Sequence, residues 1–420
     1  MQPLPNKSIE RIVLHNQGDD VNAIRAMQHF MSDGAWQDRP ILKRHWQEGD
    51  QEIGSEAGVI IVDGSGFPKQ GEASVGVKRQ WCGQLGKVDN CQVGVFLGYA
   101  SEQGYTLLDR RLYLPEEWLI DEAYADRRAK WGVPDDISFK TKPELALEMV
   151  KAVADSGQLR FGWLTCDEEF GRDPAFLDAV GQQVWYLAEV SPDTSVWLER
   201  PLTAVPPWSG KGRKPSRERL VTGQPAAASV AALAAAIPAS AWSRHSIKEG
   251  TKGPLVADFA AIRLINVRDG LPGQAVWLIC RRDVFSHEIK YYLSNAPLET
   301  ALTTFVWLTG MRWPIESCFE DGKQELGLGD YQLRSWRGWH HHMTLAILAH
   351  FFLVKVQRKM QPNVPNLTLP QAIVLLKAVL PQPKVDLETT VEIVNYYQRR
   401  HAAAYRSHRK RRLHKFNQLE

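Results

Sequence analysis

The sequence lacks the features that mark secreted, membrane-spanning and zinc-stabilised proteins. Its five cysteines are scattered and include no Cys-x-x-Cys pair, which argues against a zinc site or a disulfide framework. No run approaches the roughly 18 to 20 consecutive apolar residues that a membrane-spanning helix needs. The first residues do not have the basic and then apolar pattern of a signal peptide. We therefore predict a cytoplasmic protein with no membrane partner.

A phosphate-cradling loop is absent as well. The glycine-rich stretch GSGFPKQG at residues 64–71 does not have the G-x4-G-K-[ST] spacing of a P-loop. Three consecutive histidines, His340 to His342, could suggest a metal site. However, successive helical side chains point about 100° apart and cannot all face one ion. Neither the glycine-rich stretch nor the three histidines forms such a site, and we predict no small-molecule substrate.

Positive charge is concentrated in two segments. Residues 399–415 hold eight Lys or Arg and no acid, so removing them from the net charge of +3 leaves −5 on the rest. The second segment, residues 210–219, includes Lys211, Arg213 and Lys214. Separated basic segments on a mildly acidic body predict a polyanion partner such as nucleic acid. For residues 399–415 alone, a solvated and frayed terminus is an equal alternative.

Tryptophans stand beside basic residues in two places. Trp81 follows Lys78 and Arg79, and Trp336 precedes Arg337. Such a mixture can stack on bases or flank phosphates. Tryptophan is more often a core residue, so this signal is weak by itself. We predict DNA contacts at Lys78 and Arg79.

The chain of 420 residues is long enough for two or three domains, and its pattern of strands and helices alternates. Helical periodicity at the start, with Asp20 as a candidate N-cap, gives way to three strands from Val59. A helix at about 142–155 follows, with Thr141 and Glu144 as a capping box, and then a strand, a short helix and another strand. Three further strands are expected over residues 256–295. This order predicts an α/β fold around a mixed sheet. The predicted divisions are a helical N-terminal region (1–55), the first part of the core (56–200), a β-rich subdomain (201–297), the second part of the core (298–360) and a helical basic tail (361–420).

Two carboxylates follow apolar strands. The first strand runs from Val59 to Val62 into Asp63 and then Gly64-Ser65-Gly66, so we expect it to end at this acid. A later strand ends at Asp167, after the apolar FGWLTC. Strand ends hold side chains rigidly, and the two acids converge if the strands are neighbours. An Asp before Gly is also a common turn-former, which is the alternative for Asp63 alone.

A third acid lies in a helix that begins near Pro314, a residue suited to the first helical turn. Glu316 and Lys323 are seven residues apart and therefore share one face, about 10 Å apart along the axis. A carboxylate and a lysine on one inward face suit a metal ligand beside a phosphate contact. Nearby acids are alternatives to the three, namely Glu168, Glu169, Asp173, Glu320 and Asp321.

Phosphodiester hydrolysis explains why three acids would be useful together. The reaction needs an activated water, a stabilised leaving oxygen and neutralised phosphate charge. Two Mg²⁺ ions about 3.5 to 4 Å apart supply all three. Mg²⁺ prefers carboxylate oxygens, so two or three Asp or Glu side chains on rigid elements suffice.

The order of Asp63, Asp167 and Glu316 resembles that of the DDE-type transposases of bacterial insertion sequences, whose catalytic core is RNase H-like. Several further stretches are similar to a subgroup of these transposases, over roughly residues 20–355. They are DGSGFPKQGEASVGVKRQWCGQLGKVDNCQVGVF, LYLPEEW, TKPELALEM, CDEEFG and LRSWRGWHHHMTLAILAHFFL.

The stretch RWPIESCFEDGK fits the second half of the Tyr-Arg-Glu-Lys signature of one large branch of that family. Arg312, Glu316 and Lys323 have the family spacing, whereas the tyrosine position holds Thr309. The resemblance implies that Asp63, Asp167 and Glu316 are catalytic metal ligands for two Mg²⁺ ions, with Mn²⁺ able to substitute. It implies that Arg312 and Lys323 contact DNA near the cut.

The resemblance also implies a fold and a function. The fold is an RNase H-like mixed sheet flanked by helices, with a β-rich insertion between Asp167 and Glu316. The function is binding of the terminal inverted repeats of an insertion sequence, followed by DNA cleavage and strand transfer. The partner is double-stranded DNA at the bacterial nucleoid. Two ends must be paired, which favours a homodimer.

Two other functions are open. Relatives commonly carry a longer N-terminal helical part, so we expect the DNA-end-binding portion to be truncated here. That expectation favours a catalytically idle or domesticated DNA-binding repressor. A nuclease of the same fold with a degradative role is a third option, and it would show no preference for particular ends.

Overall fold

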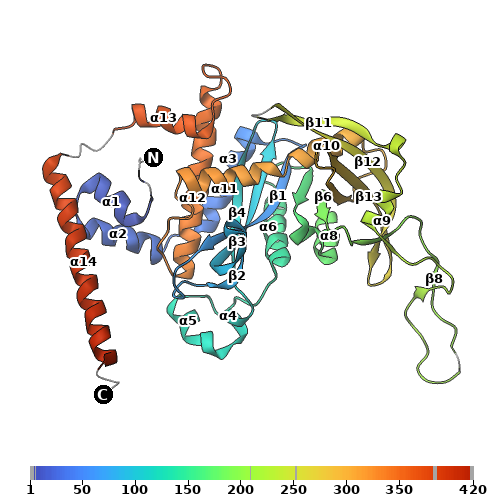
Figure 1. The fold of residues 1–420 in the computed structure, drawn as a ribbon, viewed down its shortest axis with the longest axis horizontal. Helices are drawn as coiled ribbons and strands as arrows, with labels where there is room; N and C mark the ends of the chain where they lie inside the picture. Colours follow the sequence, from blue (N-terminus) through green and yellow to red (C-terminus); the bar gives the residue numbers. More distant parts are fainter. Residues whose placement is uncertain (1–3, 5, 209, 251–252, 382–385, 417–420) are drawn as a thin grey trace.

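The computed structural model has a mixed α/β fold built on one large sheet, with helical parts at both ends of the chain (Figure 1). The structure describes residues 4, 6–208, 210–250, 253–381 and 386–416. Within these ranges no helix is long and apolar enough to cross a bilayer.

The elements follow one another in the predicted order of helices, strands, helix, strand, helices and strand. The strands are β1 (Val59–Pro68), β2 (Lys78–Cys82), β3 (Lys87–Ser101), β4 (Gly104–Tyr113), β5 (Trp163–Cys166), β6 (Trp185–Val190), β7 (Ser195–Trp197), β8 (Thr203–Ala204), β9 (Arg219–Leu220), β10 (Ala228–Ser229), β11 (Ser243–Gly250), β12 (Gly253–Arg268), β13 (Leu271–Asp283) and β14 (Ile289–Ser294). The α-helices are α1 (Ile9–Gln17), α2 (Val21–Ser32), α3 (Asp38–Ile53), α4 (Glu117–Ile120), α5 (Ala125–Lys130), α6 (Lys142–Ser156), α7 (Glu168–Gly171), α8 (Pro174–Gly181), α9 (Val230–Ala235), α10 (Leu302–Gly310), α11 (Trp313–Glu325), α12 (Trp336–Met360), α13 (Leu369–Val379) and α14 (Leu387–Phe416).

Local sequence signals place the helix starts correctly. The side chain of Asp20 caps α2 by accepting from the backbone N–H groups of Asn22 and Ala23. Thr141 and Glu144 form the predicted capping box at the start of α6. A proline lies in the first turn of α11, where its missing N–H costs nothing. These three predictions are confirmed.

The centre of the sheet has the strand pattern expected of an RNase H-like core. β1 pairs antiparallel with β3 on one side and parallel with β5 on the other, and β5 pairs parallel with β6. On the far side of β3, β4 and β2 pair with successive parts of that strand. The strands that lead to Asp63 and Asp167 are therefore neighbours, which is the condition under which the two acids converge.

The prediction that the first strand ends at Asp63 is wrong. β1 continues to Pro68, because the long strand β3 goes on pairing with it as far as Cys91. On its other side, β1 pairs with β5 only as far as Val62, whose partner is Cys166. Asp63 therefore lies where β1 and β5 separate, on a strand that stays fixed by β3.

Alternate residues of β1 point to two different helical layers. Val59 and Ile61 pack in the core that includes Ile315 of α11 and Trp339 of α12, whereas Ile60 and Val62 pack in the core of α3 and α6. Side chains alternate along a strand, so Asp63 belongs to the face that α11 covers. The glycine at position 98 of β3 lets Ile315 approach closely.

The β-rich segment continues the same sheet. β14 pairs antiparallel with β6, and β13, β12 and β7 follow outward from it (Figure 1). The three strands predicted over residues 256–295 are β12, β13 and β14. The assignment of residues 201–297 to a separate subdomain stays a prediction.

Several histidines are buried in the helical layers. Burial lowers the pKa of His45, on α3, to about 4. Its Nε2 lies 2.7 Å from the carbonyl oxygen of Leu107, and its Nδ1 is buried without a hydrogen-bond partner. In the unfolded chain this histidine titrates near pH 6.5. Between pH 6.5 and 4 the unfolded chain therefore binds more protons there, and the folded state loses stability as the pH falls.

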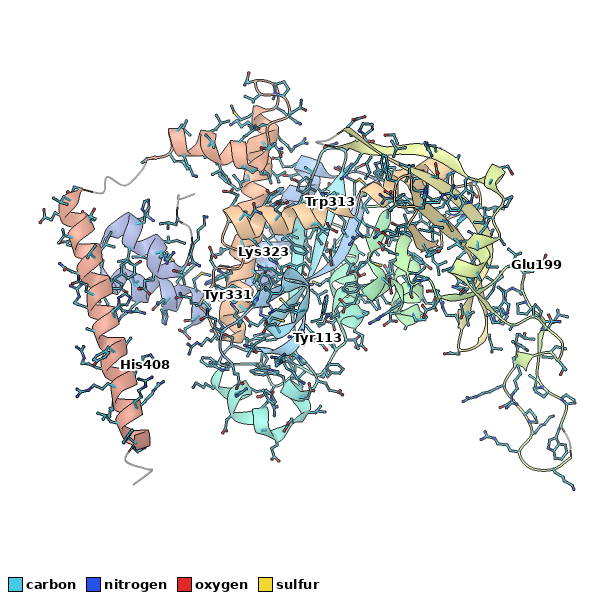
Figure 2. The ribbon with its side chains drawn as sticks, in the orientation of Figure 1. Tyr113, Glu199, Trp313, Lys323, Tyr331 and His408 are labelled. Carbon is cyan, nitrogen blue, oxygen red and sulfur yellow. The ribbon has the colours of Figure 1, made fainter. Side chains whose placement is uncertain are left out.

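We expect His45→Gln to remove part of this acid sensitivity. Between pH 7.5 and pH 5 the wild-type free energy of unfolding should fall by about 2 kcal/mol more than that of the variant. Urea unfolding at both pH values measures this difference. His408→Gln, at an exposed position on α14 (Figure 2), is the matched control and should behave as wild type. An equal loss in wild type and His45→Gln would contradict the prediction.

Candidate active site

Asp63 and Asp167 follow the last residue pair that joins β1 and β5. Val62 and Cys166 are register partners, so the next residue of each strand is one of the two acids. Asp63 Oδ1 accepts from the N–H of Gly64 at 2.7 Å. Asp167 Oδ1 accepts from the N–H of Glu169 at 3.0 Å, as the N-cap of α7. The local backbone thus fixes the orientation of both carboxylates.

Helix α11 crosses the sheet (Figures 1 and 2). Its start brings two further charged side chains to Asp63, those of Arg312 and Glu316. Arg312 precedes the helix, and its Nη1 lies 3.7 Å from Asp63 Oδ2. Arg312 Nη2 donates to Glu316 Oε1 at 2.9 Å. The guanidinium therefore lies between the strand carboxylate and the helix carboxylate.

Lys323 lies two turns further along α11, on the same side of the helix. Its Nζ donates to the carbonyl oxygen of Gly66 at 3.3 Å and lies 5.2 Å from the ring centre of Phe67. Burial lowers the pKa of Lys323, and the charge of Asp63 partly offsets that effect. Glu316 and Lys323 both face β1, as their spacing predicts.

A fourth carboxylate, Glu189 of β6, joins the group and was missed by the sequence reasoning. Arg312 Nε lies 3.9 Å from Glu189 Oε2, and Lys290 of β14 donates to Glu189 Oε1 at 2.8 Å. Glu189 is the single acid in the apolar strand WYLAEV, which is the signal that could have found it. A charged residue inside a buried strand needs a partner, and here it has two.

The electrostatics of the site are those of crowded acids around one cation. Burial and the charge of Asp167 raise the pKa of Asp63 to about 7, against the opposing effect of Arg312. Burial and the charge of Glu169 raise the pKa of Asp167. The guanidinium of Arg312 is held charged by these acids, which raise its pKa. One arginine does not neutralise the group, so a further cation would be stabilised here.

Glu169 lies beside the group, where burial and the Glu169 charge raise the pKa of Asp167, while the other alternative acids have different surroundings. Glu169 pairs with Lys142 at 2.6 Å, and Asp173 caps α8 by accepting from Phe176. Glu320 is exposed and accepts from Gln324, while Asp321 lies 4.0 Å from His350. Glu168 is exposed on α7. Geometry therefore favours Asp63, Asp167 and Glu316, although their roles stay predictions.

Thr309, at the position of the family tyrosine, lies in α10 and is buried. Its hydroxyl donates to the carbonyl oxygen of Val306 at 2.7 Å. The hydroxyl is thus engaged by its own helix. The neighbouring Trp313 has 56% of its surface exposed, and Lys248 of β11 lies 5.4 Å from its ring centre.

The other predicted DNA contacts lie outside the carboxylate group. Lys78 and Arg79 are on the edge strand β2, where Lys78 pairs with Glu117 and Arg79 is exposed. Lys211, Arg213 and Lys214 are exposed on the loop between β8 and β9, which projects from the end of the molecule opposite α14 (Figure 1). DNA contact by these five residues stays a prediction.

A divalent metal would find suitable donors here, because Asp63, Asp167 and Glu316 all offer the hard carboxylate oxygens that Mg²⁺ prefers. The raised pKa of Asp63 shows that the acids are short of positive charge. Within the described residues, however, no three His, Cys, Asp or Glu side chains converge closely enough to hold an ion ready-made. Arg312 lies among the carboxylates, so metal binding would require it to move.

Comparison with known proteins identifies the family. The profile of the DDE superfamily endonucleases matches residues 1–254, more than half of the chain. The chain belongs to the DDE endonuclease superfamily. Residues 1–254 include Asp63 and Asp167 of this DDE endonuclease, whereas Arg312, Glu316 and Lys323 lie beyond the matched range. Proteins of this family typically use divalent metal ions.

A curated relative is named as a probable transposase. The DDE endonuclease is 27% identical over 148 residues to a protein of Microchaete diplosiphon named "Probable transposase for insertion sequence element IS701". The match covers 35% of each chain, so the present chain spans about a third of the length of that relative.

Proposed function

We propose that this DDE endonuclease is a transposase of the branch with the Tyr-Arg-Glu-Lys signature. It binds the terminal inverted repeats of an insertion sequence, cuts DNA at the element ends and joins them to a target. The observation that carries the proposal is the position of Asp63 and Asp167 directly after paired residues of two adjacent strands, with Arg312 between Asp63 and Glu316 of α11. The family match and the basic segments support it.

The residues have separate tasks in this proposal. Asp63, Asp167 and Glu316 would hold two Mg²⁺ ions, which would supply an activated water and stabilisation of the leaving oxygen. Arg312 moves from the carboxylates to the DNA phosphate, and Lys323 neutralises the same backbone from the next turns of α11. Water adds to the phosphorus and the 3′-oxygen leaves. The freed 3′-hydroxyl then attacks a second phosphodiester.

Assembly follows from the same reaction. Two element ends must be held together, which a homodimer accomplishes with one site for each end. The alternative of an idle, repressor-like relative is weakened by the side chains themselves, since all three acids and both cations are present and Arg312 lies beside Asp63 and Glu316.

Specificity for element ends separates this proposal from its alternatives. Supercoiled DNA that carries the flanks of the chain's own gene should be cut in Mg²⁺ at those flanks, at least tenfold faster than the same DNA with scrambled flanks. Gel analysis of the cut ends measures this ratio. Equal cutting of both DNAs would indicate a degradative nuclease. Binding of the ends without any cutting would indicate a repressor.

A further inference from the structure

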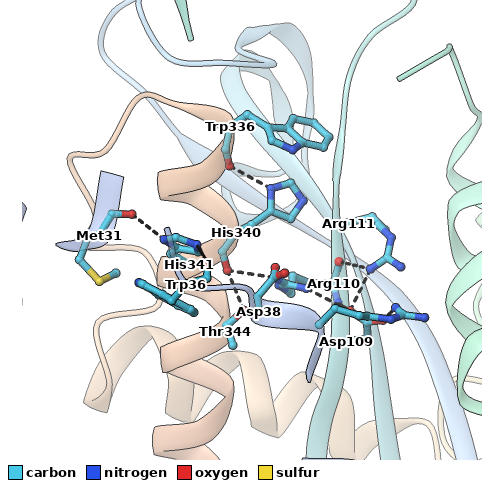
Figure 3. Close-up of polar contacts among 11 residues, drawn as sticks. Met31, Trp36, Asp38, Asp109, Arg110, Arg111, Trp336, His340, His341 and Thr344 are labelled. Carbon is cyan, nitrogen blue, oxygen red and sulfur yellow. Dashed lines mark hydrogen bonds and ion pairs between the residues drawn. The ribbon is translucent and has the colours of Figure 1, made fainter. Parts of the chain in front are cut away.

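A cavity of about 580 Å³ lies beside the edge strand β4, where the segments that lead into α3 and α12 meet this strand. Figure 3 shows Trp36, Arg110 and Arg111 of its wall. Its size is in the range of sites that bind small ligands. The basic part of its wall comprises Arg39, Arg110, Arg111, Lys140 and Arg337. We call this cavity the β4 pocket.

The β4 pocket has an excess of positive charge. Its five cations face two lining carboxylates, Asp38 and Glu148, and Asp109 lies behind the wall as a third. Asp109 is fully buried and is shared by three arginines, at 3.2 Å from Arg110, 2.9 Å from Arg111 and 3.5 Å from Arg39. Asp38 also pairs with Arg110, but two carboxylates cannot neutralise three guanidinium groups, so an anion in the pocket would be attracted.

The buried arginine at the centre still has a free donor. Only 2% of Arg110 is exposed, and its Nη2 donates to Asp38 and to the carbonyl oxygen of His340. Its Nε is buried with no hydrogen-bond partner. A buried donor without a partner is costly, so the positive charge of Arg110 is incompletely compensated by the protein.

Two helix starts add to the positive potential. Trp336 and Arg337 open α12, and Asp38 and Arg39 open α3. The N-cap of α3, Gln37, makes no side-chain capping bond, so the first N–H groups of this 16-residue helix gain no cap from it. Helix N-termini with free N–H groups favour phosphate groups.

The opposite part of the pocket is apolar. Leu112 of β4 contributes to it, together with Leu114, Leu119, Pro134 and Ile137 from the segment between β4 and α6. Trp336 lines the same cavity and stays partly exposed. A cationic rim beside an apolar wall with an indole suits a ligand that joins a phosphate to a flat ring.

The β4 pocket lies in line with the candidate active site. Asp63 is the register partner of Phe96 on β3, and Phe96 is the register partner of Arg110 on β4. Directly opposed residues of antiparallel strands share a face, so all three side chains lie on the side of α11 and α12. Two strand spacings are about 10 Å.

We propose that the β4 pocket binds one nucleotide, with its phosphate at the arginines and its ring against the apolar wall. Under the proposed function the source is a nucleotide of the bound DNA strand. This inference rests on the proposed function for its source, whereas the nucleotide chemistry comes from the pocket alone.

Calorimetric titration in EDTA tests the pocket without any cutting. The probes are dAMP, inorganic phosphate and a single-stranded 12-nucleotide DNA. Arg111→Gln and the more exposed Arg337→Gln should each weaken dAMP and 12-mer binding about tenfold, as expected for a lost charge-assisted hydrogen bond. Arg44→Gln, at an exposed arginine of α3 outside the pocket wall, is the matched control and should leave both affinities unchanged.

The outcomes separate this inference from the proposed function. Asp63→Asn should bind dAMP as wild type does, even if it no longer cuts DNA. Tighter binding of the 12-mer than of dAMP supports the DNA strand as source. The proposal is overturned if both pocket variants fold and bind dAMP as wild type. It is also overturned if inorganic phosphate binds as tightly as dAMP.

Discussion

Asp63→Asn should lower the rate of Mg²⁺-dependent DNA cleavage by about a thousandfold or more. The substitution removes a carboxylate from the group that would hold the metal and stabilise charge in the transition state. DNA binding should stay within about twofold, because no cation that faces the DNA is removed. Timed cleavage of end-bearing DNA and a gel-shift titration measure the two quantities.

The melting temperature of Asp63→Asn shows whether the variant stays folded. Burial and Asp167 raise the pKa of Asp63 to about 7, so above pH 7 the folded state carries an unfavourable charge that the unfolded chain carries more easily. The neutral amide removes that cost, and the variant should melt at the same or a higher temperature at pH 8. Asp269→Asn is the matched control, because asparagine accepts its positive φ of 51°. Wild-type cleavage by Asp63→Asn would contradict the assignment.

Arg312→Gln should have opposite effects on metal binding and on cleavage. Arg312 lies 2.9 Å from Glu316 and 3.7 Å from Asp63, where it competes with a divalent ion for the same carboxylates. Without it, DNA-free protein should bind Mn²⁺ about tenfold more tightly, as measured by electron paramagnetic resonance of free Mn²⁺. Cleavage should fall by about a hundredfold, because the phosphate loses a cation in the transition state.

The free energy of unfolding should show the same competition between Arg312 and the metal ion. In EDTA the free energy of unfolding of Arg312→Gln should fall by about 1 to 3 kcal/mol, since partly buried carboxylates lose their partner. Mn²⁺ should restore it. Arg282→Gln, which loses a contact to Asp258 far along β13, is the control and should show no Mn²⁺ effect. Unchanged or weaker Mn²⁺ binding by Arg312→Gln would show that the arginine does not compete with the metal.

Much of the site could be predicted because its signals are local. The spacing of Glu316 and Lys323 places both on one helix face whatever the helix packs against. Apolar strands before Asp63 and Asp167 predict strand-borne acids, and the structure makes these strands neighbours. The capping residues Asp20 and Thr141 predict helix starts from two or three residues each.

The rest depends on pairing between distant segments, which no local pattern encodes. The end of the first strand was placed too early, because Gly64 and Gly66 read as a turn while β3 holds them in the sheet. Glu189 joins the carboxylates only because β6 lies beside β5 and α11 crosses above them. The β4 pocket likewise combines residues from α3, β4 and α12 that are up to 300 positions apart in sequence.

Parallel cleavage assays on Asp63→Asn, Asp167→Asn and Glu316→Gln test the central claim most directly. Asp63 and Asp167 lie inside the family match and Glu316 lies outside it, so the comparison asks whether the three act as one site. The rate in Mg²⁺ on end-bearing DNA should fall to a similar low level in all three, and a double variant should be little slower than either single one. Near-wild-type cleavage by Glu316→Gln, in a protein that folds and binds the DNA, would contradict the account.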